Sequence, residues 1–324
     1  MAAILGAGSP LLDVLTRVSD EFLAKNVSGA KGGMEMIDST ERLALTALLE
    51  NAELVPGGSA GNTVFALARM GIDVAMLGKL GNDRDGDFYK NTLTSLGGRD
   101  CEFIKTDDAP TGVCLSLITP DAERTMRSDL GAAAQLTPED VRNTRFSDYD
   151  IILIEGYMLF SAAFDAVIAG AKKAGCKIAF DLASFEVVNI FRDKINSLLD
   201  DVDILFANAD EAAALVGNIP EDEQLEELSR HCPTAVLKLG KRGAMVKRCG
   251  EKVRVQAELV ENPVDTTAAG DLWAAGFLYG IVKGHSLENC AKYGSILSGE
   301  VVKVIGSQLP AESWKKIEKA LSIK

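Results

Sequence analysis

The chain has 324 residues, 47% of them hydrophobic, which is enough for the core of one large α/β domain. Its net charge of −13 argues against nucleic-acid binding, and no apolar window reaches the length of a membrane span. Six scattered cysteines disfavour a disulfide framework, and two histidines leave little support for His-based catalysis. The N-terminus lacks the basic start of a signal peptide, so we expect a cytoplasmic protein.

Short apolar runs alternate with helical patterns along the chain. We expect buried strands at residues 2–8, 73–78, 150–156, 177–181, 203–208 and 234–240, and helices at residues 62–70, 163–174, 210–216 and 221–230. This alternation predicts one α/β domain over residues 1–324, with a mainly parallel sheet flanked by helices. Ligands of such sheets bind beyond the C-terminal strand ends, where Asp13, Asn208 and Lys238 fall.

Residues 14–40 and 100–129 interrupt the alternation. Polar and apolar residues alternate in VCLSLIT and RTMRSD, which is typical of half-exposed antiparallel strands. We expect these segments to form a small β-rich lid on the main sheet. Exposed strands of this kind can pair between subunits or remain solvated, so both a monomer and a homodimer stay open.

Two glycine-containing stretches lie in the N-terminal part of the chain, the first of them directly after a predicted strand. GAGSPLLD lacks the third glycine of a dinucleotide motif and contains Pro10, which favours a tight turn. In PGGSAGNTVFALARMG, Gly57 and Gly58 let the backbone approach a ligand, and Asn62 opens an amphipathic helix. Taken alone, the second stretch is more commonly explained by a turn followed by a helix cap.

Small residues separate two carboxylates in VDTTAAGDLWAAGF, which spans residues 264–277. A turn with Asp271 as a helix cap is the ordinary explanation. The alternative is an anion site, in which amides of Ala268, Ala269 and Gly270 and the helix dipole meet negative charge. Asp271 would then be a general base, and we expect the dipole to keep it ionised near pH 7.

Together these motifs resemble the PfkB/ribokinase family of ATP-dependent sugar and nucleoside kinases. The resemblance covers nearly the whole chain. It rests on GGSAGNTVFALARMGIDVAMLGKLGNDRDG, NADE and DTTAAGD, which occur in the order of the family. It implies a Rossmann-like, ribokinase-like fold with a β-rich lid and transfer of the ATP γ-phosphate. It also implies Mg²⁺ and, in some members, K⁺.

The resemblance assigns roles to single residues. For catalysis it implies Asp271 as the base and the amides of Ala268, Ala269 and Gly270 as the anion hole. For the acceptor it implies Asp13, Gly57, Gly58, Asn62, Tyr157 and Arg124. For ATP and its phosphates it implies Asn208, Glu211, Lys238, Gly240 and Thr266. For cations it implies Glu211 near Mg²⁺, through water, and Asp265 and Thr267 at a monovalent ion.

One residue departs from the family, which usually has glycine where Ala268 stands. A positive φ at this alanine would cost about 1 kcal/mol or more. We therefore expect weakened or retuned catalysis, and a higher kcat in Ala268→Gly. A nucleoside-binding homologue with weak catalysis is the corresponding alternative.

Within the family the chain most resembles bacterial adenosine kinases, through GAGSPLLDVLTRVSDEFL, DLGAAAQLTPEDV and EGYMLF. This implies phosphorylation of adenosine to AMP, with Tyr157 stacked on the base and Arg124 near the phosphates. The alternatives are a sugar kinase, a Tyr157 that only packs under the lid, and Arg124 and Arg127 as surface charges. Met34 and Met36 either line a base pocket or simply pack. A dinucleotide-dependent oxidoreductase is a more distant alternative.

Overall fold

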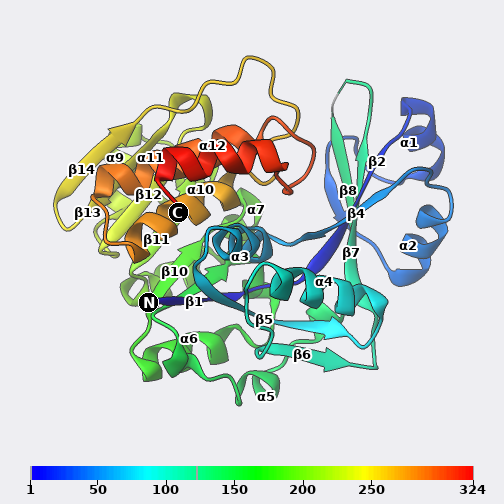
Figure 1. The fold of residues 1–324 in the computed structure, drawn as a ribbon, viewed down its shortest axis with the longest axis horizontal. Coiled ribbons are helices and arrows are strands. Elements are labelled where there is room, and N and C mark those ends of the chain that lie inside the picture. The colour runs from blue at the N-terminus through cyan, green and yellow to red at the C-terminus, as the bar shows by residue number, and fades with distance from the viewer. Residues whose placement is uncertain (1, 122, 324) are drawn as a thin grey trace.

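The computed structural model describes residues 2–121 and 123–323, which form two sheets (Figure 1). The main sheet has nine strands in the order β14-β13-β12-β11-β10-β9-β1-β5-β6. Its strands are β1 (Ala3–Ala7), β5 (Asp73–Gly81), β6 (Phe103–Thr106), β9 (Ile151–Glu155), β10 (Lys177–Asp181), β11 (Ile204–Asn208), β12 (Thr234–Lys238), β13 (Ala244–Arg248) and β14 (Glu251–Val255).

The main sheet is parallel from β12 to β6, which confirms the predicted fold class. All six predicted strands lie in this parallel part. The antiparallel β13 and β14 extend the sheet at one edge and were not predicted. Polar residues dominate β14, whose exposed face removes the continuous apolar run that identifies a buried strand.

Helices cover both faces of the main sheet. Alternate strand residues face opposite sides, so Ile4 and Leu5 belong to two separate hydrophobic clusters. Helices on the Ile4 side are α3 (Ser59–Arg69), α4 (Arg84–Ser95), α10 (Ala269–Val282), α11 (Leu287–Val301) and α12 (Ala311–Leu321). Those on the Leu5 side are α5 (Pro138–Val141), α6 (Phe164–Ala174), α7 (Phe185–Leu198), α8 (Ala209–Val216) and α9 (Glu221–Leu228).

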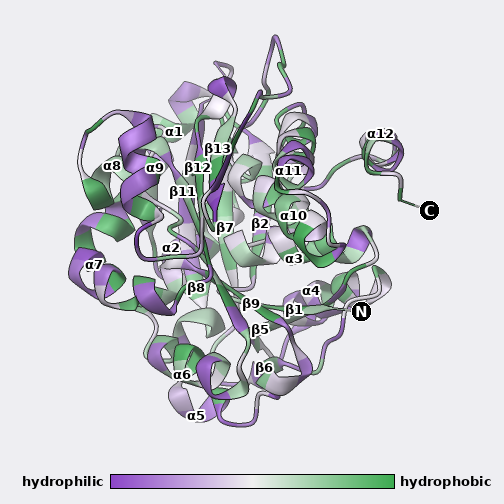
Figure 2. Ribbon diagram, turned by 90° about the vertical axis from the view of Figure 1, so that its left-hand side faces the viewer, coloured by the Kyte–Doolittle hydropathy of each residue, from purple (hydrophilic) through white to green (hydrophobic). Residues whose placement is uncertain are grey.

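The helices differ in polarity according to their surroundings. In Figure 2, α10 is coloured mainly as apolar, whereas α9 is mostly hydrophilic. Helix α10 is buried along residues 272–280, because it lies between α3 and α11. Short 3₁₀ helices complete the connections: η1 (Ala132–Gln135), η2 (Phe146–Asp148), η3 (Gly156–Phe160), η4 (Leu199–Asp201) and η5 (Gly240–Arg242).

The small sheet stands beside the main sheet and has the strand order β3-β8-β7-β2-β4 (Figure 1). Its strands are β2 (Leu11–Arg17), β3 (Met34–Met36), β4 (Glu53–Gly57), β7 (Thr111–Ile118) and β8 (Arg124–Gly131). Two helices, α1 (Asp20–Asn26) and α2 (Ser39–Thr46), connect β2, β3 and β4. The direct link from β1 to β2 carries the chain from one sheet to the other.

The small sheet differs in detail from the segments predicted at residues 14–40 and 100–129. The small sheet also contains β4, which lies outside the predicted segments. Strand β6 lies inside the second segment but pairs with β5 in the main sheet. It is mixed rather than antiparallel, since β2 pairs with β7 and β3 with β8 in parallel. Strand β7 is buried throughout, because its polar Thr111 and Ser116 bond to Asp83 and Arg124 instead of water. Alternating polarity therefore did not mean exposure.

The region beyond the carboxyl ends of the parallel strands is where the two sheets meet. Strand β1 lies between β9 and β5 and continues directly into the small sheet. In folds of this kind ligands bind at such a switch in strand order. No helix in residues 2–121 or 123–323 combines the length and the apolar character needed to cross a membrane.

Candidate active site

The last residues of four neighbouring strands form a row of polar side chains. Glu155, Asp181, Asn208 and Lys238 end β9, β10, β11 and β12, with Glu155 opposite Asp181 and Asn208 opposite Lys238. Asp181, Asn208 and Lys238 line a cavity of about 450 Å³ that also borders the start of α10. The cavity therefore lies at the sheet edge where ligands of parallel α/β sheets bind.

The ammonium group of Lys238 lies between this row and α10. Its Nζ donates to Asp181 Oδ2 at 2.9 Å. A Cβ placed on Gly270 would come within 3.2 Å of the same Nζ, so the charge is beside the first turn of α10. Burial disfavours the ammonium, but attraction from Asp181 and Glu211 outweighs burial and raises the pKa of Lys238 above its ordinary value. Lys238 therefore presents a positive charge to an anion in the cavity.

Asn208 and Glu211 cap α8 at the same edge. Asn208 Oδ1 accepts from the amides of Asp210 and Glu211, and the Glu211 carboxylate accepts from both nitrogens of Asn208 at 2.7 and 2.6 Å. Burial raises the pKa of Glu211 to about 7, although Lys238 lowers it. Both residues also line the cavity. Their oxygens are of the kind that Mg²⁺ accepts, directly or through water, so the pair fits the predicted magnesium role.

The small residues before α10 leave main-chain amides open. The Ala269 amide donates to Thr266 O at 3.2 Å, and α10 has no side-chain cap. Among the described residues, no protein acceptor meets the amides of Ala268, Gly270 or Asp271. An uncapped helix start attracts anions, so these free amides suit an anion hole. It differs from the predicted one because the Asp271 amide is free, whereas the Ala269 amide is already bonded.

Ala268 adopts a backbone conformation that any side chain accepts. Its φ is −90° and its ψ is 9°. The positive φ that would strain an alanine is absent, so the expected weakening of catalysis by the methyl group loses its physical basis. The departure from glycine at this position is conformationally neutral.

Asp271 connects the start of α10 with the start of α3. Its Oδ1 accepts from Ser59 Oγ and its Oδ2 from Asn62 Nδ2, both at 2.8 Å. The main-chain oxygen of Asp271 accepts from Thr63 Oγ1 at 2.9 Å. Ser59 and Asp271 are 212 positions apart in the sequence, so the tertiary fold alone brings them together.

Desolvation changes the charge state expected for Asp271. Burial raises its pKa to about 7, and Asp181 raises it further, while Asn62, Ser59 and Lys238 lower it. The prediction of a fully ionised Asp271 near pH 7 is therefore wrong for the unliganded protein, because loss of water outweighs the helix dipole. A pKa near the working pH makes this carboxylate a better proton acceptor than an exposed one.

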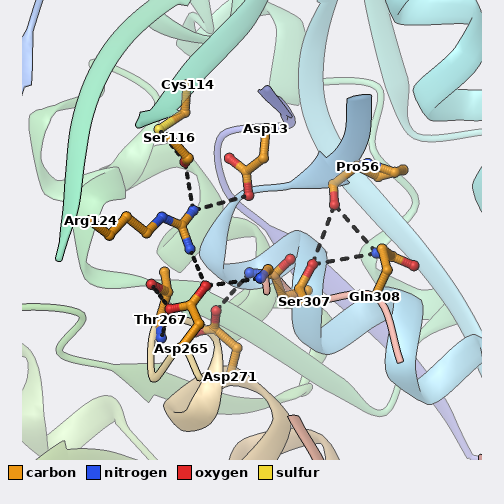
Figure 3. Close-up of polar contacts among 12 residues, drawn as sticks. Asp13, Pro56, Cys114, Ser116, Arg124, Asp265, Thr267, Asp271, Ser307 and Gln308 are labelled. Carbon is orange, nitrogen blue, oxygen red and sulfur yellow. Dashed lines mark hydrogen bonds and ion pairs between the residues drawn. The ribbon is translucent and has the colours of Figure 1, made fainter. Parts of the chain in front are cut away.

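Arg124, at the start of β8, joins the small sheet to the loop before α10 (Figure 3). Its Nη1 donates to Asp265 Oδ2 at 2.8 Å and its Nη2 to Ser116 Oγ at 2.7 Å, while Nη2 lies 3.9 Å from Asp13 Oδ2. The Arg124 side chain is only 9% exposed. Arg127 is fully buried and donates to the Ser28 carbonyl. The alternative that both arginines are surface charges is therefore wrong.

Asp265 is saturated by protein donors. Its Oδ1 accepts from the Thr267 amide and hydroxyl at 2.9 and 2.6 Å, and its Oδ2 accepts from Arg124 and from the Gly306 amide. Burial alone would raise the pKa of Asp265, but Arg124 and these hydrogen bonds hold it below the ordinary value. The carboxylate and Thr267 hydroxyl therefore do not fit a monovalent cation while Arg124 occupies this position.

Asp13 and Gly57 lie together on the adjacent strands β2 and β4 of the small sheet. A Cβ on Gly57 would lie 2.5 Å from Asp13 Oδ2, so the glycine makes room for the carboxylate. Burial raises the pKa of Asp13 to about 6, although the nearby Arg124 lowers it. Asp13 is thus a buried acceptor with a guanidinium at its side.

The remaining predicted residues lie on several different elements around the cavity and the small sheet. Gly58 precedes α3, and Gly240 and Thr266 line the cavity. Tyr157, on η3, packs against the cluster on the Leu5 side, and burial raises its pKa to about 12. Met34 and Met36 are 43% and 54% exposed, so neither is a buried core residue.

Three polar residues of the site were missed in the sequence. Ser59 bonds to Asp271, Asp181 pairs with Lys238, and Ser116 holds Arg124. Asp181 ends a strand that was predicted correctly, so its position at the ligand-binding edge was a usable signal. Ser59 carried no such signal, because its partner Asp271 is 212 positions away. Ser116 carried none because its bond to Arg124 depends on the antiparallel pairing of β7 with β8.

A model of the pfkB family of carbohydrate kinases matches residues 34–314. The chain belongs to this family. It is 31% identical to the adenosine kinase of Dictyostelium discoideum, over 96% of this chain and 98% of that protein. Two crystal structures are similar in fold: adenosine kinase from Sinorhizobium meliloti, 34% identical with a TM-score of 0.88, and a probable sugar kinase from Rhizobium etli CFN 42, 31% identical with a TM-score of 0.87.

These similarities extend over nearly the full length of both chains. The Sinorhizobium meliloti enzyme matches 98% of this chain with 99% of its own, and the Rhizobium etli protein matches 100% with 99%. As a pfkB family member the chain is an ATP-dependent phosphotransferase of the nucleoside and sugar kinase type. The cavity beside Lys238 and Asp271 is accordingly its candidate active site.

Proposed function

We propose that this kinase transfers the γ-phosphoryl group of ATP to the 5′-hydroxymethyl group of adenosine and forms AMP and ADP. The observation that supports this acceptor most directly is similarity to two adenosine kinases, at 31% and 34% identity, over at least 96% of the chain. We also propose purine salvage in the cytoplasm as the setting of this reaction.

In the proposed step the acceptor oxygen forms a bond to the γ-phosphorus while the bond to the bridging oxygen of ADP breaks. The electron pair of the broken bond leaves with ADP, and the hydroxyl proton passes to Asp271. The free amides at the start of α10 and the Lys238 ammonium stabilise charge on the transferred group. Positioning and charge stabilisation are the main contributions that phosphoryl transfer needs.

A bound Mg²⁺ would neutralise charge on the ATP phosphates. Glu211, supported by Asn208, is the residue that we propose to orient it, through water. Both side chains are held by the α8 cap before any ligand arrives. Thr266 and Gly240, also on the cavity wall, are proposed to contact ATP.

On the acceptor side, we propose that Asp13 accepts hydrogen bonds from the ribose hydroxyls, next to Gly57 and Gly58. Asn62 has its Oδ1 buried without a partner among the described residues, which leaves an acceptor for a ligand hydroxyl. Tyr157 and the exposed Met34 and Met36 are proposed to offer apolar surface to the base, and the small sheet is proposed to close as a lid.

A sugar acceptor is the second candidate. The structure of the probable sugar kinase from Rhizobium etli is nearly as similar as that of the adenosine kinase, with TM-scores of 0.87 and 0.88. A weakly active nucleoside-binding homologue is less well supported, because the φ of −90° at Ala268 removes its main argument.

The test is an ADP-release screen with adenosine, inosine, guanosine, ribose and fructose. We expect adenosine to give the highest kcat/KM. A preference for ribose or fructose would replace the proposed acceptor by a sugar and leave the kinase assignment intact.

Asp271→Ala provides the test of the base. We expect this variant to lose turnover by at least about 10³-fold, since an essential proton acceptor is removed, while ATP still binds in calorimetry. Substantial residual turnover in a folded variant would reject Asp271 as the base.

A further inference from the structure

Glu155 is a buried carboxylate behind the active site that the proposed reaction does not use. It ends β9, is only 2% exposed and lies opposite Asp181 in the neighbouring strand. Its Oε1 accepts from the Ser9 amide and its Oε2 from the Ala60 amide, both at 2.8 Å. Two segments more than 50 residues apart are thus held by one side chain.

The bond to Ala60 replaces a missing helix cap. Helix α3 follows Gly58, which has a φ of 83° and no side chain with which to cap the helix. A Cβ on Gly58 would come within 2.3 Å of the Ser9 carbonyl oxygen, so the usual Ser, Thr or Asp cap is excluded there. Glu155 supplies the acceptor oxygen from another strand, and its negative charge matches the positive end of α3.

The bond to Ser9 fixes the link between the two sheets. Ser9 lies between β1 and β2, and a Cβ on the preceding Gly8 would lie 2.4 Å from Glu155 Oε2. The absence of a side chain at Gly8 therefore makes room for the carboxylate. Four residues beyond Ser9, β2 carries Asp13.

Both segments that Glu155 holds carry residues of the site. The first turn of α3 contains Ser59 and Asn62, which bond to the two carboxylate oxygens of Asp271. The β1–β2 link places Asp13. We propose that Glu155 is a positioning residue, whose carboxylate caps α3 from β9 and thereby sets the geometry of Asp271 and of the acceptor site. This inference rests on the proposed role of Asp271.

A carboxylate is required because two N–H donors point at the two oxygens. Glutamine has nearly the same shape but only one oxygen, so Glu155→Gln directs an NH₂ group at one of the two amides. The unsatisfied donor then loosens either the start of α3 or the β1–β2 link. Because burial raises the pKa of Glu155 to about 7, the experiments use pH 8, where the wild-type carboxylate predominates.

Asp150→Asn is the matched control. Asp150 precedes β9 and accepts from the Ala3 amide at 2.8 Å, so it ties the same strand to β1 at the opposite end of the sheet. The control makes the same carboxylate-to-amide change where only one N–H donor must be met, so its remaining oxygen can still accept from the Ala3 amide, and it does not touch α3 or the link to β2.

The kinetic test uses the best acceptor of the wild-type enzyme, whichever nucleoside or sugar that is. We expect Glu155→Gln to lower kcat roughly 10- to 100-fold through misalignment, while the KM for ATP changes less than about two-fold. Asp150→Asn should stay within about two-fold of wild type in kcat. Because the acceptor is chosen by measurement, failure of the adenosine proposal leaves this test intact.

A double-mutant cycle with Ser59→Ala separates positioning from general destabilisation. If Glu155 acts through the first turn of α3, its substitution costs less kcat when the Ser59 bond to Asp271 is already absent. Additive losses, an unchanged kcat, or a Glu155→Gln variant that is simply unfolded at 25 °C by circular dichroism would overturn the proposal.

Hydrogen exchange gives a readout that needs no turnover. First-turn amides of a helix have no intrahelical partner, so protection of the Ala60 amide depends on Glu155. Peptides covering residues 8–13 and 57–64 should exchange faster in Glu155→Gln but not in Asp150→Asn. Equal protection in all three proteins would contradict the capping role.

Discussion

At the scale of single residues, the charge state of Asp271 links the local environment to catalysis. Its pKa is raised to about 7, mainly by burial, so in the unliganded enzyme the group gains a proton as the pH falls through 7. A proton acceptor must be ionised, so we expect kcat/KM to fall below about pH 7 and to level off above pH 8. The measurement is the pH profile of kcat/KM, which reports free-enzyme groups.

Asn62 provides the internal control for that assignment. Its hydrogen bond stabilises the Asp271 anion and lowers the pKa. In Asn62→Ala the acid limb should therefore move to higher pH. An acid limb that stays in place would show that another group governs the profile.

Ala268 is the second residue with a testable consequence. Because its φ is −90°, glycine relieves no strain there. We now expect Ala268→Gly to leave kcat within about two-fold of wild type, contrary to the increase expected from sequence alone. Steady-state kinetics of the wild type and of Ala268→Gly tests this expectation. A clear gain in kcat would mean that the loop before α10 adopts another conformation during turnover.

At the scale of elements, Arg124 couples the small sheet to the loop that precedes α10. It is the partner of Asp265, and its charge occupies the place expected for a monovalent cation. We therefore expect wild-type kcat to change less than about two-fold when K⁺ is replaced by a large organic cation. Arg124→Met should lower kcat and make the remaining activity depend on K⁺, because Asp265 is then left without its counter-charge.

The control for Arg124 is Arg17→Met, which removes an exposed arginine at the end of β2 in the same sheet. This change should leave kcat and the response to K⁺ unaltered. If wild type itself needs K⁺, or if Arg124→Met remains indifferent to K⁺, the guanidinium does not replace the cation.

At the scale of the whole molecule, buried carboxylates of the site oppose stability at neutral pH. The pKa values of Asp13, Glu155, Glu211 and Asp271 are raised to about 6, 7, 7 and 7, mainly by burial. Between about pH 4 and 7 the folded state therefore binds more protons than the unfolded state. The stability that these groups contribute is complete below their unfolded pKa values and is lost as the pH rises to 7.

We accordingly expect the melting temperature of the unliganded enzyme to be higher at pH 5.5 than at pH 7.5. Asp271→Asn, which cannot ionise, should raise the free energy of unfolding at pH 7.5 by about 1–2 kcal/mol and reduce the difference between the two pH values. Thermal scans of both proteins test this. A wild-type melting temperature that rises from pH 5.5 to 7.5 would contradict the raised pKa values.

Six strands of the main sheet, four of the helices, the fold class and the family can be read from the amino-acid sequence alone. Buried parallel strands are continuous apolar runs, and the motifs around Gly57, Asn208 and Asp271 are local, so both are legible without the fold. The polar strand β14 was not predicted, and β7 was expected to be half-exposed although it is fully buried. Both errors arise because exposure depends on which elements cover a strand.

The charge of the site and the hydrogen-bond partners within it depend on the packed fold. The raised pKa of Asp271 depends on desolvation by the surrounding elements, and its bonds to Ser59 and Asn62 span more than 200 residues. The burial of Arg124 against Asp265 and the capping of α3 by Glu155 are likewise contacts between distant segments. Local sequence specifies backbone preferences and motifs, whereas desolvation and long-range pairing arise only when the packed chain excludes water.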